Sequence, residues 1–124
     1  MSFTYLGSPY TGSPEIMEVR YEAVLQATKW LLEKRIWVYS PIIHCHELAK
    51  RFNMPRDMAF WKDYNRAMLS SARTFLILAL PGWADSVGLQ AEIDAATDLK
   101  MPIMFMSLPP ETIGVYHVYQ EDRS

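Results

Sequence analysis

An α/β fold with helices on both faces of a parallel sheet is predicted for this chain. Short apolar runs typical of buried strands, at 3–6, 36–39, 74–80 and 102–106, alternate with longer segments of helical periodicity. Such alternation indicates parallel strands joined by right-handed crossovers. The chain has 124 residues, which suits one domain, 1–124, with one core. We therefore expect a single-domain, doubly wound α/β/α sandwich of four to five strands, flavodoxin- or Rossmann-like.

The first helix is predicted over 15–35, where apolar residues recur at helical spacing and the opposite face is charged. Ser13 followed by Pro14 fits an N-cap with proline at the first helical position. The remaining predicted elements are helices at 44–52, 57–72 and 89–99, and a fifth, edge strand at 115–119.

Composition narrows the class of ligand. A net charge of -2 leaves no basic excess to neutralise a nucleic-acid polymer, whereas one mononucleotide needs only a few local donors. The single cysteine, Cys45, excludes an intrachain disulfide and a thiolate metal cluster. We see no signal peptide and no apolar stretch near the roughly 20 residues of a membrane span. We expect a cytoplasmic protein that binds a small molecule, with no membrane partner.

The stretch from Pro81 to Glu92 organises the predicted site. It follows an apolar strand and leads through small polar residues into a helix, as a ligand loop does at the carboxyl end of a parallel sheet. Backbone N–H groups at that helix start are unpaired and attract anions. Three loops are predicted to meet at this edge of the sheet, namely 7–12, 40–44 and 82–92.

Glu92 is the main candidate for chemistry. A glutamate in an early helical turn is often a surface residue favoured by the helix dipole. The small-residue loop upstream, and the lack of another carboxylate so placed on the other two loops, favour a functional role as a nucleophile. Ser86 and Gly88 suit both a helix cap with a turn and a phosphate site, and these two interpretations coexist.

Other candidates lie on the same loops and on the helix before the third strand. The loop after the first strand lacks GxGxxG and GxxxxGK[ST], so neither a dinucleotide site nor a P-loop is supported. The sequence His44-Cys45-His46, with His117 as the only other histidine, does not make a metal set, and we predict no metal. Trp61 and Trp83 suit base stacking, although tryptophans are more often core residues. The remaining candidates are Gly7, Ser8, Pro9, Tyr10, Ser40, His44, Asp63 and Asn65.

Two motifs resemble the nucleoside 2-deoxyribosyltransferase superfamily: Tyr5-Leu6-Gly7-Ser8-Pro9-Tyr10, and the run from Ser86 to Ile93 that contains Gly88 and Glu92. Leu80-Pro81-Gly82-Trp83 before this run is similar to a small, often phage-associated branch. The resemblance implies that Glu92 attacks C1′ of a deoxyribosyl group and that 7–10 contacts sugar and base. It implies no cofactor, and a homo-oligomer, dimer or tetramer, with sites near subunit interfaces.

Two departures from the family pattern direct the functional hypothesis. Ser86 stands where transferases acting on free nucleosides carry an acid, and the resembling nucleoside 5′-monophosphate N-glycosidases have serine there. Asn65 falls nearest the family's aspartate, with Asp63 two residues earlier, so either is a candidate partner of Glu92. We therefore expect hydrolysis of the N-glycosidic bond of a (deoxy)nucleoside 5′-monophosphate, with Trp83, Ser40 and His44 among the substrate-binding residues.

Three alternatives stay open at this point. Base exchange by a nucleoside 2-deoxyribosyltransferase uses the same nucleophile and differs in what fills the vacated base pocket. A nucleotide-binding module without turnover needs only the loops. A phosphoribohydrolase of the lysine-decarboxylase-like group is disfavoured, because Trp83 replaces the second glycine of its Pro-Gly-Gly-x-Gly-Thr signature.

Overall fold

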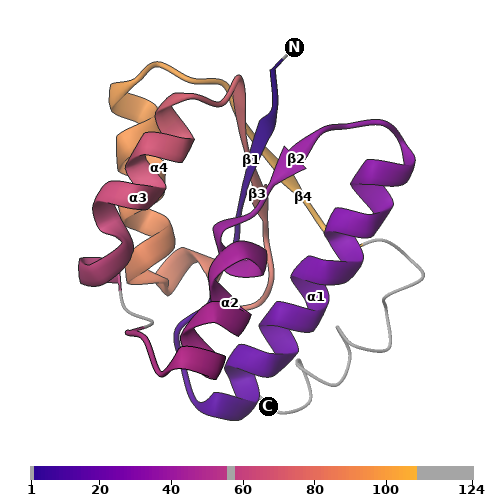
Figure 1. Ribbon diagram of the computed structural model, residues 1–124. Coiled ribbons are helices and arrows are strands. Elements are labelled where there is room, and N and C mark those ends of the chain that lie inside the picture. The colour runs from indigo at the N-terminus through magenta and orange to yellow at the C-terminus, as the bar shows by residue number, and fades with distance from the viewer. Residues whose placement is uncertain (1, 56–57, 109–124) are drawn as a thin grey trace.

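The computed structural model describes residues 2–55 and 58–108, and the edge strand predicted at 115–119 lies outside them. Figure 1 shows the elements in space. In chain order they are β1 (Thr4–Gly7), α1 (Pro14–Glu33), β2 (Val38–Tyr39), α2 (Pro41–Phe52), α3 (Met58–Ser70), β3 (Thr74–Leu78), the 3-10 turn η1 (Trp83–Asp85), α4 (Val87–Asp98) and β4 (Ile103–Met106).

The four strands form one parallel sheet in the order β2-β1-β3-β4. Thr4 pairs with Thr74 and Gly7 with Ile77, so β1 and β3 run side by side to their carboxyl ends. The chain steps from β1 to β2 on one side and then returns to β3 on the other. This reversal opens a crevice beyond the carboxyl ends of β1 and β3, where ligands bind in such sheets. The predicted doubly wound α/β fold is confirmed.

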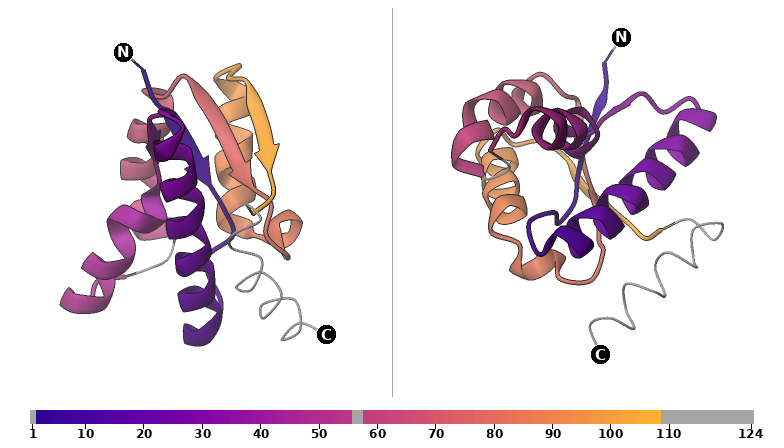
Figure 2. Two further views of the ribbon diagram at one scale, coloured as in Figure 1. Left: turned by 90° about the vertical axis from the view of Figure 1, so that its right-hand side faces the viewer. Right: turned by 60° about the horizontal axis from the view of Figure 1, so that its bottom comes forward.

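Helices cover both faces of the sheet, as Figures 1 and 2 show. Successive strand residues point to opposite faces. Leu6 of β1 therefore packs with α1 and with Ile42 of α2, whereas Tyr5 packs with α3 and α4. The buried polar end of Tyr5 thus lies on the same face as α4, the helix that carries Glu92.

Capping serines set the bounds of three helices. Ser13 Oγ accepts a hydrogen bond from the N–H of Ile16 with Pro14 at the first position, as predicted. Ser40 caps α2 in the same way, so α2 begins at Pro41 and not at the predicted residue 44. Ser86 caps α4, which begins two residues before the predicted start.

Three of the four strands are shorter than predicted, whereas β1 has the predicted four residues and lies one position later. The ladder of β3 ends at Leu78, and the N–H of Leu80 turns back to donate to the carbonyl of Leu78. β2 has only two paired residues. No helix in the described ranges is both long and apolar enough to cross a membrane.

Candidate active site

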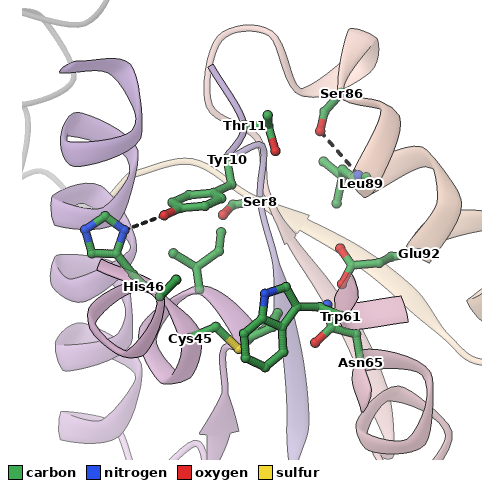
Figure 3. A pocket seen from close by; sticks show the side chains of 14 residues that line it. Ser8, Tyr10, Thr11, Cys45, His46, Trp61, Asn65, Ser86, Leu89 and Glu92 are labelled. Carbon is green, nitrogen blue, oxygen red and sulfur yellow. Dashed lines mark hydrogen bonds between the residues drawn. The ribbon is translucent and has the colours of Figure 1, made fainter. Parts of the chain in front are cut away.

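A cavity of about 80 Å³ lies at the crevice between β1 and β3. Its wall combines the loop after β1, one face of α2, two side chains of α3 and the start of α4. Figure 3 shows Ser86 and Glu92 on one side, Tyr10 and His46 on the other, and Trp61 between them. The space is several times what one water molecule needs, so it suits part of a small organic ligand.

Glu92 is the acidic group of the cavity. It lies on α4 and is only 8 % exposed. Its Oε2 accepts a hydrogen bond from the Tyr5 hydroxyl at 2.5 Å. Burial raises the pKa of the Glu92 carboxyl to about 7, although the hydrogen bond from Tyr5 lowers it. A buried carboxyl that changes charge near neutral pH in a cleft is typical of a functional group.

The start of α4 presents donors to the same cavity. Ser86 Oγ accepts from the N–H of Leu89 at 3.2 Å, which leaves the Ser86 O–H available to donate. The N–H groups of Val87 and Gly88 donate to no acceptor in the described part of the chain. Apart from Gly88, its two chain neighbours and the adjacent backbone of α4, no described atom lies within 4 Å of the place where a Gly88 Cβ would stand, so the backbone is open to a ligand there. Two free N–H groups and a hydroxyl at a helix start favour an anion.

Two buried polar atoms of the cavity wall lack partners. Ser8 Oγ, after β1, and Asn65 Oδ1, on α3, are buried and form no hydrogen bond with any described residue. Leaving such an atom unpaired costs about 1–3 kcal/mol. A polar ligand that bonds to Ser8 and Asn65 would remove this cost.

The opposite wall is largely apolar and is built by one face of α2. Besides Pro41 at the start of α2, its lining residues follow the helical spacing i, i+3, i+4 and i+7 and are Ile42, Cys45, His46 and Ala49. Trp61 of α3 completes this wall, and its indole N–H donates to the carbonyl of Pro55 at 2.7 Å. Burial raises the pKa of the Cys45 thiol to about 11, so Cys45 is a neutral thiol. A flat aromatic base fits such a wall.

His46 connects the cavity to the surface. Its Nδ1 and the Tyr10 hydroxyl form a hydrogen bond of 2.5 Å, and its Nε2 lies 3.2 Å from Oε1 of Glu18. The Tyr21 ring stacks on the imidazole with centroids 4.0 Å apart. Lys50 Nζ in turn bonds the same Glu18 oxygen at 3.0 Å.

The structure brings seven of the predicted residues to one cavity. They come from three separate segments of the chain and are Ser8, Tyr10, Trp61, Asn65, Ser86, Gly88 and Glu92.

Several other predicted residues lie away from the cavity. His44 is exposed, because α2 starts at Pro41 and this phase turns 44 outward to stack on Tyr64. Asp63 is exposed on α3. Trp83 packs against Phe105 with ring centroids 5.2 Å apart.

Three predicted binding residues have structural roles instead. Ser40 is occupied as the cap of α2. Gly7 is paired within the sheet, where a Cβ would lie 2.5 Å from Phe75 Cε1. Pro9 is fully buried and does not line the cavity.

Sequence reasoning missed Tyr5 and His46. Strand alternation was the available signal for Tyr5, because it places that phenol on the α4 face. For His46 the signal was the Ser40-Pro41 cap, which fixes the phase of α2.

A comparison with curated proteins finds no match. A family model, described as Domain of unknown function (DUF1937), matches residues 2–108, which is most of the chain and includes every cavity residue. The chain therefore belongs to the DUF1937 family.

Proposed function

We propose that this protein hydrolyses the N-glycosidic bond of a (deoxy)nucleoside 5′-monophosphate, with Glu92 as the nucleophile. One observation carries the proposal: the buried Glu92 carboxyl shares its cavity with Ser86 and with Gly88 at the start of α4, where the N–H of Gly88 is unpaired among the described residues. A phosphate at the helix start and a carboxylate one turn later match the two ends of a sugar phosphate. The resemblance to the nucleoside 2-deoxyribosyltransferase superfamily supports the same reaction.

Each wall has a role in this mechanism. The Ser86 O–H and the N–H groups of Val87 and Gly88 hold the phosphate, and Ser8 bonds the sugar. The ionised Glu92 attacks C1′, the C1′–N bond breaks, and its electron pair leaves with the base. Water then attacks C1′ of the glycosyl-enzyme and releases Glu92. The developing positive charge on the sugar is stabilised by the same carboxylate, as in retaining glycosidases.

Tyr5 positions the nucleophile. Its O–H donates to one carboxyl oxygen of Glu92, which fixes the carboxyl plane and leaves the other oxygen for C1′. Burial also raises the pKa of Tyr5 well above its ordinary value, so the phenol stays a donor.

The experiment is a panel of nucleosides and nucleoside 5′-monophosphates, scored by free base in chromatography. We expect base release from monophosphates by the wild type and by Asp94→Asn, an exposed acid on the same helix. Glu92→Gln should lose release by at least about a hundredfold, because an amide is no nucleophile. Release by Glu92→Gln at the wild-type rate would contradict the role of Glu92, and no release from any panel member would leave only a binding module.

Base exchange on free nucleosides is a second candidate. One observation favours it: no described residue of the cavity wall is lysine or arginine, which a phosphate dianion usually attracts. Arg20 is buried outside this wall, and its Nη1 donates to the carbonyl of Thr11, a cavity residue, at 2.9 Å. Adding a second free base to the panel separates the two reactions, since only the transferase forms a new nucleoside.

A further inference from the structure

We propose that Tyr10, hydrogen-bonded to His46, donates the proton that the leaving base takes up. This inference rests on the proposed function and names the acid for the same site. It concerns a side of the cavity opposite Glu92.

The cavity offers few other acids. Its described wall has four ionisable side chains, namely Tyr10, Cys45, His46 and Glu92. Glu92 is occupied as the nucleophile. Asn65, which falls nearest the position of the aspartate of the resembling family, has no acidic proton, and Asp63 lies exposed outside the cavity. Cys45 has no described hydrogen-bond partner that would return a proton to its thiol.

Tyr10, by contrast, is joined to a proton source. Its hydroxyl lies 2.5 Å from His46 Nδ1, and His46 Nε2 lies 3.2 Å from Glu18 Oε1. The His46 side chain is fully buried, whereas Glu18 and Lys50 are about half exposed, so the chain of contacts runs from cavity to solvent. Both ring nitrogens of His46 are thus engaged, Nδ1 with the Tyr10 hydroxyl and Nε2 with the Glu18 carboxylate, and an imidazole held between two polar groups in this way can pass a proton.

The arrangement of the walls directs the base toward Tyr10. With the phosphate at Ser86 and C1′ at Glu92, the only large aromatic platform left in the described wall is Trp61, which lies between Glu92 and Tyr10 in Figure 3. A base lying against Trp61 turns its far edge to the Tyr10 and His46 side. The polar atoms of that edge then meet the Tyr10 hydroxyl.

The proton balance closes over the two steps. In the first, the C1′–N bond breaks, the Tyr10 O–H proton passes to the base, and the Nδ1 proton of His46 passes to the Tyr10 oxygen, while the proton on Nε2 stays toward Glu18 and leaves a neutral imidazole. In the second, the water oxygen bonds to C1′, the Glu92 ester bond breaks, and the water proton returns through Tyr10 to His46 Nδ1. The net products are the protonated base and the sugar phosphate with a new hydroxyl group.

A leaving group that needs no proton tests this role. Each nucleotide that the wild type cleaves is compared with its counterpart carrying a ring-methylated, positively charged base (7-methylguanine, 7-methyladenine or 3-methylcytosine). Such a base departs as a neutral molecule without taking up a proton. We expect Tyr10→Phe to slow release of the ordinary base by about a hundredfold and to leave release of the methylated base within about threefold of the wild type. His46→Gln should show the same selective loss, and it carries the test if Tyr10→Phe does not fold.

Controls separate this inference from the proposed function. Tyr64→Phe removes a hydroxyl from α3 outside the cavity and should change neither rate. Glu92→Gln should slow both substrates, because both need the nucleophile. Equal losses on both substrates in Tyr10→Phe and His46→Gln, or no loss, would overturn the assignment of the acid while leaving Glu92 in place. Equal rates for Glu92→Gln and the wild type would overturn the proposed function itself.

Discussion

At the scale of single residues, the burial of the Glu92 carboxyl destabilises the folded protein when the carboxyl is ionised. A carboxyl is hydrated in the unfolded chain, whereas here it is 8 % exposed with the Tyr5 hydroxyl as its hydrogen-bond donor. Burial outweighs that bond, and the pKa rises from 4.5 to about 7. A side chain selected only for stability would not be a carboxyl buried at such a position.

This cost predicts a pH-dependent difference in stability. Because the folded pKa is raised, the folded state binds the proton more tightly than the unfolded state, and stability falls as pH rises from about 4.5 to 7. Neutral Glu92→Gln lacks this loss. Its free energy of unfolding relative to the wild type should increase by about 3 kcal/mol between pH 4.5 and pH 8, measured by urea unfolding.

Asp94→Asn is the matched control, since Asp94 is exposed on the same helix. Its difference from the wild type should stay nearly constant over the same pH range. A constant difference for Glu92→Gln as well would mean that the carboxyl is not buried as described.

At the scale of elements, close packing of β1 against α4 holds the two sides of the site together. Gly7 lies where β1 ends, and a Cβ there would lie 2.5 Å from Phe75 Cε1, 2.7 Å from Phe75 Cζ and 3.1 Å from Leu89 Cδ1. Gly7 therefore allows β1 to pack closely against Phe75 and Leu89, and it does not contact a ligand. The start of α4 has the opposite character, because Gly88 has open space where its Cβ would stand.

These two glycines predict opposite responses to alanine. Gly7→Ala must move the Phe75 ring or the strand, and we expect a loss of about 1–3 kcal/mol in the free energy of unfolding. Gly88→Ala adds a methyl group without a clash at a helical position, so stability should be unchanged or slightly higher. Urea unfolding of both variants measures this, and a Gly7→Ala variant as stable as the wild type would contradict the packing at the end of β1.

At the scale of the whole molecule, the alternation of apolar strands with amphipathic helices was enough to predict the fold. The errors lie at element boundaries. Ser40-Pro41 repeats the cap pattern of Ser13-Pro14 and starts α2 at residue 41, three residues before the helix start predicted at 44. That shift changed which side of α2 faces the cavity, so His44 was predicted where the structure places His46.

The part of the site that one stretch of sequence specifies was predicted. Ser86, Gly88 and Glu92 follow one strand, and the rule for ligand loops in parallel sheets places them together. Tyr5 and Glu92 are 87 residues apart, and His46 lies 36 residues from Tyr10 and 28 from Glu18. Such contacts depend on strand order and helix phase at once, and no single stretch of the sequence specifies them.

The most direct test of the account is the mass of the protein during turnover. In a nucleoside 5′-monophosphate with fluorine at C2′, the fluorine withdraws electrons from C1′ and slows both steps of the reaction. A base that leaves more readily restores the rate of the first step only. Rapid acid quench and peptide mass spectrometry should then find a sugar-phosphate adduct on Glu92 in the wild type and none in Glu92→Gln. Base release with no adduct, or an adduct on another residue, would contradict Glu92 as the nucleophile.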